Sequence, residues 1–339
     1  MGSIITLSIV QSALELGFIY ALVALALFIS FRILNIADLS TDGCFTLGCA
    51  VCATVTMAGH PVLALFAAMA AGVCSGFVTA FLQTRLGIQS ILAGIIVNTG
   101  LYTINIAVMG FASNVNLFNC ESVFTWAKAS IGGSWYKLIV AAIIVIAVGI
   151  LISIFLNTRL GLSIRATGDN PDMVRASSIN TGLMITIGLC VANALTALSG
   201  GLLAQYQKSC DINLGTGMVT IALASLIIGE TIIGKGNMLK RVAGVILGSC
   251  LYRFIVAVAL RMNVPAECLK LVSAIIVAVA IALPYLKKQA AFYCQKRAAR
   301  AENKAYIREI TGDETSAFQK PKAEIGMNSK EENRNGGNV

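Results

Sequence analysis

Continuously apolar stretches of about 20 residues recur along most of this chain, and they limit its possible folds more than any other feature. Each stretch, wound as a helix, is long enough to cross the ~30 Å hydrocarbon core of a bilayer. Hydrophobic residues make up 57% of the sequence and charged residues only 12%, too few to cover the surface of a soluble domain. The stretches lack the polar–apolar alternation of a membrane β-barrel. The sequence therefore predicts an all-α protein that crosses the membrane several times.

Nine membrane-spanning helices are expected, with eight and ten as the neighbouring counts. Most basic residues in the short connections fall on one side of the membrane, and that side is expected to be the cytoplasm. The membrane domain is expected to cover residues 1–286, and residues 287–339 to form a basic cytoplasmic tail that is partly disordered and anchored to anionic lipid. The expected spans are residues 7–30, 41–58, 61–82, 88–111, 136–157, 184–206, 215–234, 242–260 and 267–286.

The longest connection on the predicted cytoplasmic side, residues 157–183, is expected to contain a short ordered helix. Asn170 is suited to cap this helix and Pro171 to occupy its first position. The residues that follow, DMVRASSIN, make about two helical turns before Gly182, which is expected to end the helix. A short helix across the mouth of a membrane protein suits docking on a soluble partner, and a solvated connector is the alternative.

Several long stretches resemble one family of membrane proteins. GLSIRATGDNPDMVRASSINTG and the small-residue helix ALTALSGGLLAQ are similar to the coupling segment of ABC-importer permeases of the branched-chain amino acid and ribose type. LGFIYALVALALFISFRILNIADLSTDGCFTLGCAV looks like the start of those permeases, and FRILNIADLSTDGCF most resembles the subgroup that serves tryptophan or tyrosine-type binding proteins. ASLIIGETIIG and LYRFIVAVAL with ECLKLVSA are similar to the same subgroup. The resemblance covers residues 12–286.

The resemblance implies a homodimeric permease of a bacterial plasma membrane that imports amino acids, aromatic ones in particular, delivered by an extracellular binding protein. Each copy would rest its coupling helix on a separate ATP-hydrolysing subunit. The chain contains no G-x-x-x-x-G-K-[ST] loop for nucleotide phosphates, so a transport subunit is expected rather than an enzyme, with ATP and Mg²⁺ held by the partner and no cofactor in this chain. The ATPase contacts expected from the resemblance, with the alanines and glycine allowing close approach, are Arg165, Ala166, Gly168, Asp169, Asn170, Arg175 and Ala176.

A polar segment, NIADLSTDGCF at residues 35–45, separates the first two apolar runs. Non-helical backbone at membrane depth is tolerated only where protein or water surrounds it, so the second span is expected to have a broken or re-entrant start inside the protein. Thr41 and Asp42 are expected to cap that helix. Asp38 is expected to close a cytoplasmic gate by an ion pair with Arg32 or Arg85, and a direct contact with substrate is the alternative.

Other polar residues inside apolar runs are candidates for a pathway through the membrane. Asn213 opens the seventh span from the outer side as Asn35 opens the second, which is consistent with an inverted repeat. Arg253 is expected to bridge to a neighbouring carboxylate or to backbone carbonyls; pairing with Glu230 and binding of a substrate carboxylate stay open. The expected gate and pathway residues are Asn35, Asp38, Asp42, Asn98, Thr99, Asn193, Thr220, Glu230 and Arg253.

Two other kinds of transporter are compatible with the pattern. A ribose-type or nucleoside importer would share the fold. An ion-coupled secondary transporter would use Asp38, Glu230 and Arg253 as a relay, although such a carrier has no ATPase on which residues 157–183 could dock. No metal site is expected, because His60 is the only histidine and the Cys49–Cys52 pair is typical of small buried side chains in an apolar helix.

Overall fold

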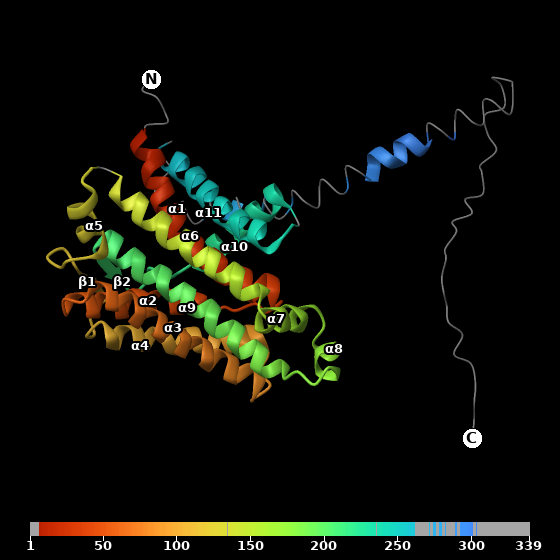
Figure 1. Cartoon of the computed structure of the whole chain (residues 1–339), viewed down its shortest axis with the longest axis horizontal. Coiled ribbons are helices and arrows are strands. Elements are labelled where there is room, and N and C mark those ends of the chain that lie inside the picture. The colour runs from red at the N-terminus through yellow and green to blue at the C-terminus, as the bar shows by residue number, and fades with distance from the viewer. Residues whose placement is uncertain are drawn as a thin grey trace. The chain divides into compact units, whose positions relative to one another are not determined.

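The computed structural model describes residues 7–133, 135–234 and 236–261, and beyond them only residues 271, 274, 275, 278, 279, 282, 289, 292–300 and 303. The chain separates into two units, residues 1–284 and 285–339, and in the second unit residues 292–300 are helical. The first unit (Figure 1) contains the elements α1 Leu7–Leu27, the π-helix η1 Phe28–Ile33, α2 Thr41–Met57, α3 Pro61–Thr84, α4 Ser90–Val108, β1 Asn114–Asn116, α5 Val123–Ile131, α6 Tyr136–Asn157, α7 Arg159–Asp169, α8 Pro171–Ala176, α9 Thr181–Gln207, β2 Ser209–Asp211, α10 Met218–Ile233 and α11 Met238–Arg261.

Most of these helices have the length and composition of membrane spans. Six of the described helices are long and apolar enough to cross a membrane, namely α1 with η1, α3, α4, α6, α9 and α11. α2 and α10 are shorter apolar helices. These eight helices coincide with eight of the predicted spans, which confirms a helical protein that crosses the membrane several times. The expected ninth span at 267–286 lies outside the described residues except for single positions, so the count of nine stays a prediction.

Short elements in the connections were not predicted from the sequence. β1 pairs antiparallel with β2, with Asn114 opposite Asp211, and so joins the connection after α4 to the connection after α9. Strands of three residues are too short to show an alternating pattern in the sequence. The two strands and α5 lie at one end of the helices, and α7 and α8 lie at the other end (Figure 1).

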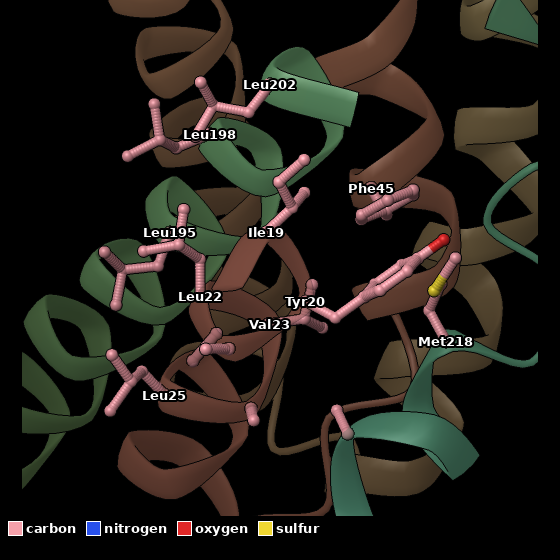
Figure 2. Packing of buried hydrophobic residues seen from close by; sticks show 14 of the residues in the cluster. Ile19, Tyr20, Leu22, Val23, Leu25, Phe45, Leu195, Leu198, Leu202 and Met218 are labelled. Atoms are coloured by element: carbon pink, nitrogen blue, oxygen red, sulfur yellow. The ribbon is translucent and has the colours of Figure 1, made fainter. Parts of the chain in front are cut away.

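The core of the first unit lies around α1. Every residue of the stretch 19–29 is at most 5% exposed, as expected for a helix that is apolar on all sides. α1 contacts α6, α9, α10 and α11, and α2, α3 and α4 follow beyond α9 (Figure 1). Figure 2 shows Tyr20 of α1 beside Phe45 of α2 and Met218 of α10. The rings of Tyr20 and Phe45 are stacked with centroids 6.2 Å apart, so α1 connects the helices on its two sides.

Glycine residues allow α2 and α3 to contact the backbone of α9 directly. A Cβ atom on Gly48 of α2 would meet the backbone of Ala197, and one on Gly72 of α3 would meet the carbonyl oxygen of Asn193. Such close approach is typical of membrane helices, where small residues replace the hydrophobic driving force that is missing in lipid. The contacts fix the position of α2 along α9.

We expect Gly48→Val to destabilise the protein by about 1–3 kcal/mol, because its side chain would overlap the backbone of Ala197. Gly100→Val in α4 is the matched control, since a Cβ there has no neighbour within 4 Å. The fraction of folded protein during titration with a denaturing detergent measures both effects. Equal destabilisation by the two substitutions would show that α2 does not contact the backbone of α9 at Gly48.

Candidate functional site

The N-terminal ends of α2 and α10 meet inside the bundle. Asp42, in the first turn of α2, accepts hydrogen bonds from the backbone N–H of Gly217 at 3.0 Å and of Val219 at 2.9 Å, at the start of α10. Thr46 Oγ1 accepts the N–H of Gly215 at 3.1 Å. A helix N-terminus carries about half a positive elementary charge. One carboxylate therefore offsets the positive ends of two helices that would otherwise repel each other.

This junction lies level with the middle of α9. Asn193, near the midpoint of α9, donates from Nδ2 to Asp38 Oδ2 at 2.9 Å, just before α2 begins. From this level α2 runs toward the C-terminal end of α9, where Gln205 Nε2 bonds to the last turn of α2 at 3.3 Å. α10 runs the opposite way and ends where Glu230 pairs with Arg32 of η1. The two shorter helices thus begin at mid-depth and extend toward opposite ends of the bundle.

The capping role of Asp42 differs from the prediction. Asp42 and Thr41 were expected to cap α2, but the Asp42 carboxylate caps α10, and Thr41 Oγ1 donates to the carbonyl oxygen of Asp38 at 3.1 Å. The residue that precedes α2, Ser40, makes no side-chain cap. The partners of Asp42 begin 175 residues farther along the chain, so local sequence could not reveal them.

Asp38 is buried and bonded to neutral groups. Its Oδ1 accepts the N–H of Ser40 at 2.8 Å and the hydroxyl of Ser40 at 2.6 Å, and its Oδ2 accepts the amide of Asn193. The side chain is only 2% exposed, and it forms no ion pair with any described arginine. The predicted ion pair with Arg32 or Arg85 is therefore wrong. Three short hydrogen bonds to a carboxylate stabilise its charge in place, and no arginine is required.

Glu230 and Arg253 also have partners other than those expected. Glu230 Oε1 accepts from Arg32 Nε at 2.7 Å and from Arg241 Nη2 at 3.4 Å. The guanidinium of Arg253 lies 4.0 Å from the centroid of the Tyr20 ring, a cation–π contact, and its buried Nε has no hydrogen-bond partner. Among the described residues Arg253 has no carboxylate or carbonyl partner. Within the described residues, neither the expected bridge nor the alternative pair with Glu230 is formed.

The remaining predicted pathway residues divide into two groups. Asn98 of α4 lies at the junction, where a Cβ atom on Gly43 of α2 would meet its Oδ1. Thr99 is exposed and donates to a carbonyl one turn earlier in its own helix at 2.9 Å. Thr220 is exposed on α10. Asn35 is exposed and has a φ of +58°, a left-handed conformation that asparagine tolerates better than most residues.

Sequence reasoning missed other polar residues around the junction. Asn105 of α4 donates from Nδ2 to the backbone of α2 at 3.1 Å, and Ser75 of α3 is buried nearby. In the described part of the chain, Oδ1 of Asn105, Oδ1 of Asn193 and Oγ of Ser75 are buried without hydrogen-bond partners. Such atoms are rare and need an explanation, for example a ligand or a second conformation that supplies partners. Lone polar residues within apolar helices are the signal that could have found Asn105 and Ser75.

A groove of about 590 Å³ borders the junction between α2, α3 and α4. Its lining is apolar except for Ser75 and Cys74. A ligand that carries charged groups would lose its hydration there without gaining partners. The polar junction itself, rather than this groove, is therefore the candidate contact for a polar ligand.

A second candidate site lies on α7 and α8 within the connection 157–183. Asn170 Oδ1 accepts the N–H groups of Asp172 and Met173, each at 3.1 Å, and Pro171 occupies the first position of α8. The predicted cap and helix start are thus confirmed.

The end of this helix was predicted wrongly. α8 ends at Ala176, and Ser178 adopts a left-handed φ of +61° shortly after it. Gly182 lies in the first turn of α9, which Asn180 caps by accepting the N–H of Leu183 at 3.2 Å. Asn180 is a residue type that is favoured at helix starts, and it indicated the start of α9. The prediction that Gly182 ends the preceding helix did not take this into account.

The predicted ATPase contacts differ in exposure. Gly168 packs against its own chain, because a Cβ atom there would meet the carbonyl oxygen of Ile33, and its close approach to a partner stays a prediction. Arg175 Nε donates to Thr181 Oγ1 at 3.2 Å while its side chain stays 68% exposed. Arg165 and Ala166 are half-buried on α7, whereas the exposed members of the set are Asp169, Asn170, Arg175 and Ala176.

Comparison with known proteins identifies relatives along nearly the whole chain. A model of the family described as "Branched-chain amino acid transport system / permease component" matches residues 9–282. The tyrosine transport system permease protein of Clostridioides difficile (strain R20291) is 34% identical over 267 residues, which cover 78% of this chain and 88% of that protein. An uncharacterized protein of Rickettsia prowazekii (strain Madrid E) is 30% identical over 279 residues, 81% and 97% of the two chains.

A more distant relative is a sugar transporter. The ribose import permease of Escherichia coli (strain K12) is 25% identical over 235 residues, which cover 64% of this chain and 67% of that protein. No solved structure matches the chain.

We expect Asp42→Asn to destabilise the protein by about 1.5–3 kcal/mol, because an amide loses the charge and accepts only one of the two N–H groups of α10 well. Asp38→Asn is the matched comparison. Its new NH₂ group can donate to Oδ1 of Asn193, which is unpaired, if the Asn193 amide turns over. We therefore expect a smaller loss for Asp38→Asn in detergent unfolding. A larger loss for Asp38→Asn would contradict the assignment of Asp42 as the main cap.

Proposed function

The chain belongs to the family of branched-chain amino acid transport system permease components, and we propose that it is the membrane-spanning subunit of an ATP-driven importer of amino acids, aromatic ones in particular. The observation that carries the choice of substrate is the 34% identity with a tyrosine transport system permease over 88% of that protein. The relative that imports ribose is less similar, at 25% identity. Amino acids are therefore favoured over sugars as the transported class.

The junction of α2 and α10 is the polar part of the proposed pathway. Helices that start at mid-depth leave N–H groups and polar side chains inside a bundle whose surroundings are apolar, an arrangement that transporters use for charged substrates. Asp38, Asp42, Asn98 and Asn193 lie at this junction, and the unpaired amide oxygen of Asn193 provides an acceptor for a passing ammonium group. α2 and α10 run in opposite directions from the junction. This arrangement supports the predicted broken start of the second span and the predicted inverted repeat.

Energy for transport comes from a separate ATPase that docks on α8. The helix is capped, solvent-exposed and placed at one end of the bundle, and it presents Met173 with 54% of its surface exposed. The sequence GETIIGKG at 229–236 comes nearest to a phosphate-binding loop, but Gly236 replaces the required Ser or Thr, and its first part belongs to α10. ATP and Mg²⁺ therefore belong to the partner subunit.

The end with α7 and α8 faces the cytoplasm in this proposal, because the basic connections lie there. The opposite end, with α5 and the paired strands, then faces outward and receives the substrate-binding protein. A second copy of the chain completes the pathway in the plasma membrane of a bacterium. A secondary carrier is disfavoured, because Asp38, Glu230 and Arg253 have separate partners and form no relay among themselves.

The docking role of α8 predicts a loss of coupling on Asn170→Ala. Removing the cap costs about 0.5–2 kcal/mol of helix stability, which should fray a helix of six residues while leaving the membrane helices intact. We expect weaker co-purification of the ATPase and less substrate-stimulated ATP hydrolysis, with unchanged yield of the permease. Gln89→Ala is a control outside α8, because Gln89 is exposed before α4 and its side chain makes no cap. Wild-type coupling in the Asn170 variant would refute docking on α8.

The transport function is tested with the permease, its ATPase and its binding protein in proteoliposomes. We expect ATP-dependent uptake of radiolabelled tyrosine or tryptophan that competing aromatic amino acids reduce and ribose does not. Uptake of ribose alone would favour the sugar importer. Uptake that follows an ion gradient without ATP would show that the chain is a secondary carrier.

A further inference from the structure

A cavity of about 470 Å³ lies where α6, α7 and α11 meet, at the same end of the bundle as α8. Arginine side chains from two different helices line it, Arg165 of α7 and Arg241 of α11. Asn157, the last residue of α6, and Asn237, just before α11, add amide groups to the wall. None of the described residues that line it is acidic, so this part of the cavity is polar and electropositive.

The positive charge of this cavity is only partly neutralised. Glu230 accepts from Arg241 at 3.4 Å, but the same oxygen accepts from Arg32 at 2.7 Å, so one carboxylate serves two guanidinium groups. Arg165 has no ion pair within the described part of the chain. The N–H of Arg241 bonds to the carbonyl of Asn237 at 3.1 Å, which places the first N–H groups of α11 at the cavity. These first N–H groups have no acceptor within their own helix.

An exposed apolar face leads directly to the cavity. Ile150, Leu151 and Ile154 on α6 are 48%, 68% and 63% exposed, and Ile154 precedes Asn157 by one helical turn on the same side. Leu239 at the cavity is 56% exposed. In a helix that crosses a membrane, such a face contacts acyl chains. A cationic cavity at the end of this face has the geometry that fits a phospholipid.

We propose that this cavity binds the phosphate of an anionic phospholipid, with the acyl chains along α6. The guanidinium groups of Arg165 and Arg241 donate to the phosphate oxygens, and the start of α11 adds N–H groups and the positive end of its dipole. A soluble phosphate ion offers the same oxygens but leaves the leucines and isoleucines of the rim exposed. The lipid would hold α7 against α11, and α7 leads directly into α8.

The test uses the purified permease alone in detergent, so it is independent of the substrate and of the ATPase. Native mass spectrometry measures the retention of phosphatidylglycerol against phosphatidylcholine, with and without millimolar inorganic phosphate. We expect preferential retention of phosphatidylglycerol and about tenfold weaker binding in Arg165→Gln, since one charge-assisted contact is lost. Arg159→Gln is the matched control, because Arg159 is exposed on the same helix and does not line the cavity. Asn237→Asp, which adds a negative charge to the cavity, should weaken retention as well.

Three results would overturn the proposal. Equal retention of the two lipids would show no site for an anionic headgroup. Equal loss in Arg159→Gln and Arg165→Gln would indicate attraction to the basic surface in general. Retention of inorganic phosphate by the permease without retention of phosphatidylglycerol would assign the cavity to a soluble anion.

Discussion

The carboxylate of Asp42 at the starts of both α2 and α10 is the interaction on which the interior of this protein depends. A helix that begins inside a membrane protein leaves N–H groups without water to satisfy them, and each unsatisfied group costs several kcal/mol in an apolar medium. Asp42 satisfies two of these groups on α10 while it lies in the first turn of α2. Asp38 satisfies the N–H of Ser40 beside it. Two acidic residues therefore make two internal helix starts possible.

The surrounding helices hold this polar junction in place. Glycines of α2 and α3 bring both helices against the backbone of α9, and Asn193 of α9 reaches Asp38 from the position set by those contacts. The buried apolar stretch 19–29 of α1 and η1 fills the space between α9 and α10 (Figure 2). The result is an apolar bundle with polar atoms concentrated at mid-depth, some of them unpaired. That distribution suits a permease, because a polar substrate needs partners only along its path.

Features with a local cause were predictable from the sequence. The positions of eight helices followed from the lengths of the apolar runs, and Asn170 with Pro171 correctly indicated the start of α8 because a cap and its helix are neighbours. Features that depend on distant residues were not. Asp42 was assigned to its own helix, Asp38 to an arginine, and Arg253 to a carboxylate or backbone carbonyls. Instead, Asp42 contacts the start of α10, Asp38 contacts Ser40 and Asn193, and Arg253 contacts the ring of Tyr20. Charge alone identified these residues as important, but it could not choose among neutral amides, backbone N–H groups and an aromatic ring.

The shared start of α2 and α10 is tested most directly by a double-mutant cycle between Asp42→Ala and Val219→Pro. Proline is tolerated in the first turn of a helix and removes the N–H that Asp42 accepts from Val219. The free energy of unfolding is measured for the parent, both single variants and the double variant. If Asp42 caps α10, Asp42→Ala should cost about 1–2 kcal/mol less in the Val219→Pro background than in the parent. Effects that add within about 0.3–0.5 kcal/mol would show that the two residues do not interact and would contradict the junction.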